Sequence, residues 1–143
     1  RGSAVLQLAP LLIHHPDQRA HLDARGYALA DVLDGPLADI VDLSAAIHPT
    51  TRPDGDHTAS GLWWQCMTDL VDEEFHAMLT ECAWTTPPPV VDLPALLDRC
   101  RVARIREETM TVRDRLRGGP NEADTRRLAE LAGGLRALQA NRR

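Results

Sequence analysis

The feature that most constrains the fold of this chain is a pair of amphipathic segments separated by Gly118-Gly119-Pro120. After the break, four leucines follow at spacings of three, four and three residues: Leu128, Leu131, Leu135 and Leu138. Before it, residues at helical spacing share one side of an Arg- and Glu-rich segment: Leu97, Cys100, Ile105, Thr109, Val112 and Leu116. Glycine and proline stop a helix, and Asn121 with Asp124 resembles a capping box at the start of the next one. We therefore expect an antiparallel helical hairpin.

The rest of the chain also predicts helices. Hydrophobic residues make up 43% of the sequence and aromatic residues only 3%, so the core must consist mainly of Leu, Ala, Val and Ile. Ala and Leu favour helices, whereas strands are rich in β-branched and aromatic residues. Turn signals at Gly26, 34–36 and 48–56 divide the first part of the chain into short helices. The predicted fold is all-α, a small helical bundle followed by the C-terminal hairpin.

Several positions in the bundle carry finer expectations. The apolar segment 4–13 is expected to be a helix, and Pro10 predicts either a kink in it or its start. Its inward side chains are expected to be Leu6, Leu8, Leu11 and Leu12. Asp72 is expected to cap the helix that follows it. Of the adjacent Trp63 and Trp64, one ring is expected in the core and the other at its edge, because neighbouring residues lie about 100° apart around a helix.

The charge divides the chain into two parts. Residues 1–90 contain four arginines and thirteen acidic residues, a net charge of −9, whereas residues 91–143 contain twelve arginines and eight acidic residues, a net charge of +4. Three consecutive prolines at 87–89 favour an extended connector between the two parts. We therefore predict a helical-bundle subdomain over residues 1–86 and a hairpin subdomain over residues 87–143.

The sequence offers no constellation that predicts catalysis, and we expect no catalytic residue, no metal site and no cofactor. Glu73-x-x-His76 has the spacing found in di-iron bundles, but such sites need a second pair and further carboxylates. The histidines and cysteines lack ligand spacing or a nucleophile motif: His14, His15, His21, Cys66, Cys82 and Cys100. Gly133-Gly134 conflicts with a helix, because each glycine costs about 1 kcal/mol relative to alanine in a helix interior.

The order of these segments resembles the C-terminal helicase-binding domain of the bacterial replicative primase. The stretches that carry the resemblance are LLIHHPDQRAHL, HTASGLWWQCM and DEEFHAMLTECA, followed by the two arms LPALLDRCRVARIREETMTVRDRL and NEADTRRLAELAGGLRAL. Together they cover nearly the whole chain, and the two arms are the most persuasive part.

The resemblance implies a domain without polymerase chemistry, because the zinc-binding and RNA-polymerase parts of a primase precede it. It implies binding to the N-terminal domains of the hexameric replicative helicase, which recruits primase to the replication fork and modulates both enzymes. The hairpin would supply much of the contact. The residues expected to bind the helicase are Arg126, Arg127, Leu128, Leu131, Leu135, Arg136 and Leu138.

Two other readings remain open. The chain is also compatible with a helical nucleic-acid-binding module or with the N-terminal domain of a replicative helicase, whose fold is similar. The arginines are interleaved with acids and lack accompanying aromatics, so we expect no sequence-specific nucleic-acid binding. Because no run reaches the roughly 20 apolar residues of a membrane span, we expect no membrane partner. The three cysteines have no paired spacing, so we expect a reduced protein with a cytoplasmic location.

Overall fold

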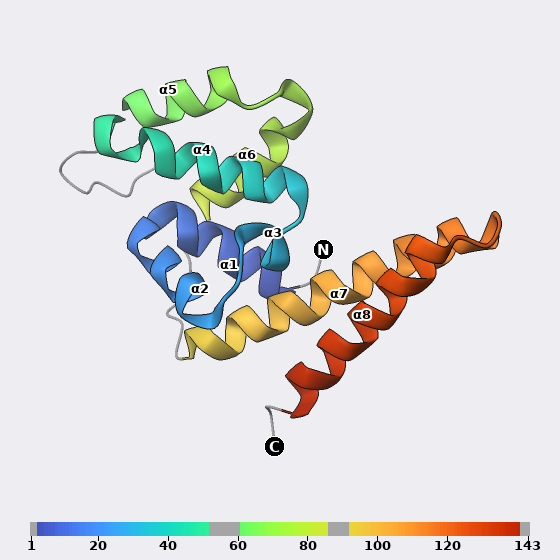
Figure 1. The fold of residues 1–143 in the computed structure, drawn as a ribbon. Helices are drawn as coiled ribbons and strands as arrows, with labels where there is room; N and C mark the ends of the chain where they lie inside the picture. Colours follow the sequence, from blue (N-terminus) through green and yellow to red (C-terminus); the bar gives the residue numbers. More distant parts are fainter. Residues whose placement is uncertain (1–2, 52–60, 86–91, 141–143) are drawn as a thin grey trace.

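The structure, a computed structural model, describes residues 3–51, 61–85 and 92–140, and these residues form helices and their connections. Figure 1 shows a bundle of short helices and a two-helix hairpin that extends away from it. The predicted all-α class and the C-terminal hairpin are therefore confirmed. The elements are α1 (Ser3–His14), the 3-10 helix η1 (Pro16–Arg19), α2 (Ala20–Arg25), α3 (Leu29–Val32), α4 (Gly35–Thr51), α5 (Gly61–Leu70), the 3-10 helix η2 (Glu73–Phe75), α6 (His76–Trp84), α7 (Leu93–Arg117) and α8 (Glu122–Ala140).

Local sequence signals set several helix ends. Gly26 adopts a left-handed conformation (φ 74°) directly after α2, which is how many helices end. Asp34 caps the start of α4, since the Leu37 amide donates to its Oδ1 at 3.2 Å. Asp92 does the same for α7, where the Ala95 amide donates to Oδ1 at 3.1 Å.

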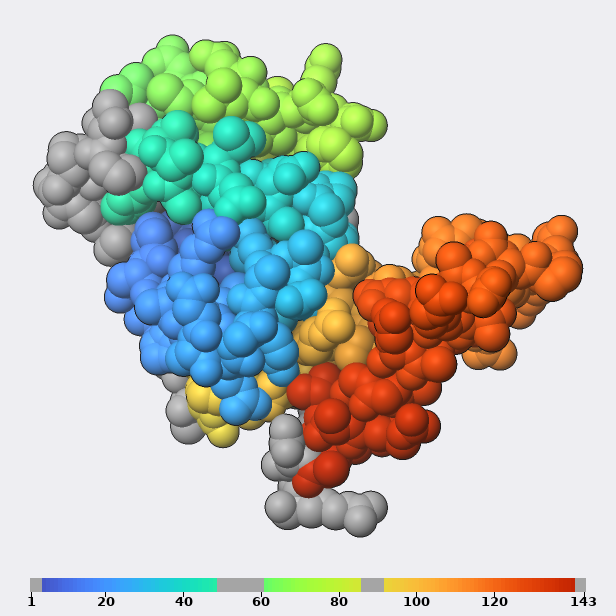
Figure 2. Space-filling model, viewed as in Figure 1, coloured from blue at the N-terminus to red at the C-terminus, as the bar shows by residue number. Residues whose placement is uncertain are grey.

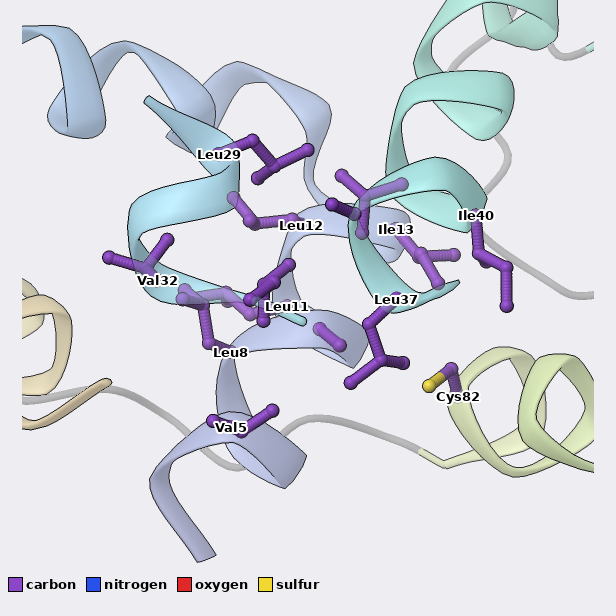
Figure 3. Packing of buried hydrophobic residues seen from close by; sticks show 14 of the residues in the cluster. Val5, Leu8, Leu11, Leu12, Ile13, Leu29, Val32, Leu37, Ile40 and Cys82 are labelled. Atoms are coloured by element: carbon purple, nitrogen blue, oxygen red, sulfur yellow. The ribbon is translucent and has the colours of Figure 1, made fainter. Parts of the chain in front are cut away.

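The core of the bundle is built around α1. Figure 3 shows Leu8, Leu12 and Ile13 of α1 among side chains from α3, α4 and α6. Leu8 and Ile13 are completely buried, and the cluster extends to Trp63 of α5. Its neighbour Trp64 is half-buried and meets Trp84 edge to face, with ring centroids 5.7 Å apart. The expectation that the two adjacent tryptophans divide between core and edge is confirmed.

The long helix α7 belongs to both parts of the molecule. Its first turns carry Leu96, Leu97 and Cys100 into the same buried cluster as α1. Its distal half leaves the bundle and pairs with α8, as Figure 1 shows. The proline connector predicted at 87–89 lies outside the described residues.

α1 begins at Ser3 and contains Pro10, so of the two alternatives for this proline the start of the helix is excluded. Two expectations for the bundle are wrong. Leu6 is 39% exposed, because the core covers the faces that carry Leu8, Leu11 and Leu12. The loop predicted from residue 48 is helical to Thr51, since α4 continues through Pro49.

Asp72 occupies the position before η2, as expected, but its side chain makes no capping hydrogen bond there. The segment first forms the 3-10 turn Glu73–Phe75 and becomes α-helical only at His76. The rest of the predicted loop, residues 52–56, lies outside the described residues.

The turn between α7 and α8 follows the sequence closely. The amides of Gly118 and Gly119 close α7 by donating to the Arg115 and Leu116 carbonyls, both at 3.1 Å. Gly119 has a φ of 148°, which a residue with a side chain rarely adopts. Asn121 then caps α8, because its Oδ1 accepts from the Asp124 amide at 3.1 Å. The capping box is only half formed, since the Asp124 carboxylate pairs with Arg115 at 3.0 Å.

Candidate protein-binding surface on the hairpin

Polar contacts fix the base of the hairpin to the bundle. The Asp98 carboxylate of α7 pairs with Arg25 at the end of α2 and accepts a hydrogen bond from the Tyr27 hydroxyl at 2.6 Å. The hydrogen bond to Asp98 raises the pKa of Arg25. Burial, together with the hydrogen bond to Asp98, raises the pKa of Tyr27 to about 12. Both groups therefore stay protonated to higher pH than they would outside this Asp98–Arg25–Tyr27 joint, which extends the paired form to alkaline pH.

A second contact lies one turn along α7. The Arg101 guanidinium lies 3.7 Å from an Asp31 carboxylate oxygen and donates to the Asp31 carbonyl at 3.3 Å. Between the two polar contacts, Cys100 points into the core, where burial raises the pKa of its thiol to about 12. A buried thiol of this kind acts as a small apolar group rather than as a nucleophile.

Beyond the joint, the two arms of the hairpin share a narrow apolar seam. Ile105 and Val112 of α7 and Leu131 of α8 are buried, and they lie outside the main core cluster. A Cβ placed on Gly134 would lie 3.6 Å from Ile105 Cδ1, which is an ordinary van der Waals distance. The glycine pair is therefore not required by close packing, and its φ angles are negative.

An ion-pair clip joins the arms beside this seam. Arg127 of α8 donates to both carboxylate oxygens of Glu108 on α7, at 2.7 and 2.9 Å, and to Glu130 at 3.1 Å. The hydrogen bonds from Arg127 lower the pKa of Glu108, and those to Glu108 and Glu130 raise the pKa of Arg127. A bidentate contact of this geometry fixes the register of one helix against the other.

The seven residues predicted to bind a partner have different roles within the hairpin. Leu131 and Arg127 hold the arms together, so their side chains are largely committed inside the hairpin. Leu128 and Leu135 are half-buried at the edge of the seam. Two arginines remain exposed: Arg126, whose guanidinium lies 3.3 Å from Glu122, and Arg136, which has no ion-pair partner among the described residues.

Leu138 lies apart from the others. With Ala137 and Gly134 it lines a cavity of about 420 Å³ where the end of α8 approaches the bundle. The opposite wall includes Tyr27 and Arg101 from the joint. The end of α8 therefore faces the bundle rather than the tip of the hairpin.

Sequence reasoning missed one surface residue of the hairpin. Met110 of α7 is 66% exposed, the largest exposed fraction among the exposed large apolar side chains of the described residues. It lies off the apolar stripe of α7, so a search for the core face does not select it. An exposed methionine among arginines is a feature of adaptable protein-binding surfaces.

Elsewhere the described residues offer little chemistry. They contain no group of three or more His, Cys, Asp and Glu side chains that could hold a metal ion. A ring nitrogen of His76, from the Glu73-x-x-His76 pair, is 2.8 Å from the Val71 carbonyl oxygen, a local hydrogen bond. No described helix combines the length and apolarity needed to cross a bilayer.

Comparison with protein-family models, with curated proteins and with solved structures gives no match for this chain.

Proposed function

We propose that the chain is a protein-docking module that acts through the exposed outer face of its hairpin. The observation that carries this proposal is an arm that is stabilised from within and projects from the bundle. Figure 2 shows the distal half of α7 and the first part of α8 standing clear of the bundle. The seam and the Arg127–Glu108 clip account for the stability of the arm. The exposed Arg126, Arg136 and Met110 are then available to a partner.

The partner we propose is the N-terminal domain of a hexameric replicative helicase, as the resemblance to the primase C-terminal domain implies. The chain would then recruit a primase to the fork in the cytoplasm and modulate both activities by binding, not by catalysis. A long helix that begins in a bundle and ends in a terminal hairpin supports this proposal. Docking of a helical face into a partner's groove is the expected mode, with arginine setting register and association rate.

The nucleic-acid alternative has less support. Five arginines of α7 and α8 already pair with carboxylates of the same two helices among the described residues: Arg104, Arg115, Arg117, Arg126 and Arg127. The positive charge of an arginine that already pairs with a carboxylate of the hairpin is partly neutralised, so it attracts a phosphate less strongly. This alternative predicts an affinity for duplex DNA that falls steeply with salt.

The test is a mixing experiment with the replicative helicase of the same organism, by size-exclusion chromatography with light scattering. Removing residues 121–143 should abolish the complex, but it would also expose Ile105 and Val112. The sharper variant is therefore Arg136→Glu, which should weaken binding at least about tenfold because it replaces a positive charge in the contact with a negative one.

Arg99→Glu is the matched control, since Arg99 is exposed on the same helix pair but at the end of α7 that packs in the bundle. It should leave binding unchanged. A complex that survives both Arg136→Glu and the truncation would exclude the hairpin as the interface. No complex at micromolar concentrations and low salt would exclude the helicase as the partner.

A further inference from the structure

A second surface lies on the bundle, away from the hairpin. An open groove of about 700 Å³ runs between the start of α4 and the end of α5. Figure 1 shows why it is there: α5 runs antiparallel to α4, and the chain turns away toward α6 where α5 ends. The groove follows α4 from Pro36 to Ala46, eleven residues that span about 15 Å of helix. That length suits about three turns of a bound helix.

The floor of the groove is apolar. Ile40 of α4 and Val71 after α5 are buried, whereas Leu43 and Phe75 are half-buried. Leu70 is 54% exposed at the edge, so part of the apolar surface faces solvent. Exposed apolar surface in a concave site is where a partner's apolar side chains gain most from burial.

The rim of the groove is acidic. Asp39, Asp42 and Asp72 line it, and all three are exposed. None of the described residues that line it is basic, and Asp42 pairs with Arg19 at 2.6 Å from outside the lining. Along the chain, no arginine or lysine occurs between Arg52 and Arg99. The potential at the groove is therefore negative, and it disfavours nucleic acid and anionic membrane surfaces.

The hairpin of a second copy is a poor occupant. The hairpin is basic and so complements the acidic groove. The exposed positions on one face of α8, however, include no large apolar side chain: they are Ala129, Ala132 and Arg136. Met110 is the one large exposed apolar side chain of the described hairpin. A groove of this length needs apolar anchors on successive turns of the bound helix. The described hairpin of a second copy lacks such anchors, which favours a different protein as the occupant.

We infer that the groove between α4 and α5 binds a basic amphipathic helix of a partner protein. The apolar side chains of the bound helix lie along Ile40, Leu43 and Phe75, and the arginines or lysines that flank them pair with Asp39 and Asp72. This site lies on different helices from the hairpin surface and does not depend on the proposed helicase contact.

The experiment measures the binding of synthetic helical peptides to the full chain by fluorescence anisotropy. Three peptides of about four turns share leucines spaced to face one side and differ only in their flanking residues, which are arginine, glutamine or glutamate. The arginine peptide should bind at micromolar concentration, with an affinity that falls as salt is raised. The glutamate peptide should bind at least about tenfold more weakly.

Two leucines of α5 supply a matched pair of variants. Leu70 and Leu62 are 54% and 55% exposed, but only Leu70 lines the groove. Because both are exposed, neither substitution should disturb the fold. Leu70→Asn should weaken binding of the arginine peptide about tenfold, and Leu62→Asn by less than about twofold.

Three results would overturn the inference. The first is no binding of the arginine peptide at about 1 mM, and the second is equal binding of the arginine and glutamate peptides. The third is self-association of the chain that Leu70→Asn abolishes, because a second copy would then fill the groove. Loss of helicase binding in Arg136→Glu with unchanged peptide binding would separate this site from the hairpin surface.

Discussion

The bundle and the hairpin are stabilised in different ways. The bundle has one continuous apolar cluster that joins α1, α3, α4, α5, α6 and the start of α7. The distal hairpin has a thin seam of Ile105, Val112 and Leu131 with an ion-pair clip beside it. Burial is a non-directional contribution shared by many residues, whereas a clip depends on two side chains and on pH. The bundle should therefore unfold as a unit, and the hairpin should open locally.

The largest expected effect comes from the same substitution made in each region. Leu8 and Leu131 have exposed fractions of 0% and 3%, so Leu8→Ala and Leu131→Ala remove nearly equal burial. Leu8→Ala should lower the free energy of global unfolding by roughly 3–5 kcal/mol, because the cavity lies in a packed core. Urea denaturation followed by circular dichroism measures this loss.

Leu131→Ala should cost less in the same assay, roughly 2–3 kcal/mol, because the thin seam can relax into the space. Amide hydrogen exchange should then quicken in α8 and the distal half of α7, with little change in α1. Equal acceleration in α1 would mean that the two regions unfold together.

The next effect is expected at the joint between the two regions. Tyr27→Phe removes the hydroxyl that donates to Asp98 and should cost roughly 1.5 kcal/mol, as for other hydrogen bonds to charged groups. Since the folded pKa of Tyr27 is raised above its ordinary value of 10, this stability is fully present below pH 10 and is lost as pH rises toward 12.

Tyr27 is the one tyrosine of the chain, so phenolate absorbance reports its ionisation directly. The midpoint should lie near 12 in the folded protein and return toward 10 in urea, but only part of the way in Asp98→Asn, because burial is the larger cause of the shift and remains in that variant. Equal folded midpoints for the unsubstituted chain and Asp98→Asn would show that the hydrogen bond does not form in solution.

A smaller effect is expected from the clip. Arg127→Met should cost about 1 kcal/mol or less, because both partners are partly exposed and solvent screens the pair. The folded pKa of Glu108 is lowered, so the contribution of the clip is present above its ordinary pKa of 4.5 and is lost as pH falls through the lowered value.

Carboxyl chemical shifts of Glu108 followed by NMR from pH 6 to pH 2 measure this directly. In Arg127→Met the titration should move back toward 4.5. Arg126→Met is the control, since Arg126 pairs with Glu122 on its own helix and should leave Glu108 unchanged.

The smallest expected effect has the opposite sign. Gly133→Ala and Gly134→Ala should each stabilise α8, by roughly 0.5–1 kcal/mol, because alanine restricts the unfolded chain more than glycine does. A Cβ on Gly133 meets no atom within 4 Å, and one on Gly134 meets Ile105 at an ordinary distance. Slower amide exchange in α8 alone would confirm the gain, and destabilisation by either substitution would show that the glycines serve packing or bending.

Much of the fold follows from local signals, and much of the candidate surface does not. Spacing selected Leu131 as an apolar position but could not tell whether α7 or a partner covers it. The same limit applies to Arg127, because its partner Glu108 lies nineteen residues away in the sequence. Met110 and the groove beside Leu70 gave no local signal. Each is exposed because no other helix packs over it, and the sequence pattern does not show which helices pack together.

The sequence by itself determined the helical class and the position of the hairpin turn, because glycine, proline and Asn121 act on the backbone next to them. Only the tertiary structure decided that α7 serves two regions, with Leu97 in the core of the bundle and Val112 in the seam of the hairpin. Both residues belong to one regular apolar stripe along α7. The physical reason is that periodicity identifies the apolar face of a helix, whereas the partner that buries each turn is set by the packing of the whole chain.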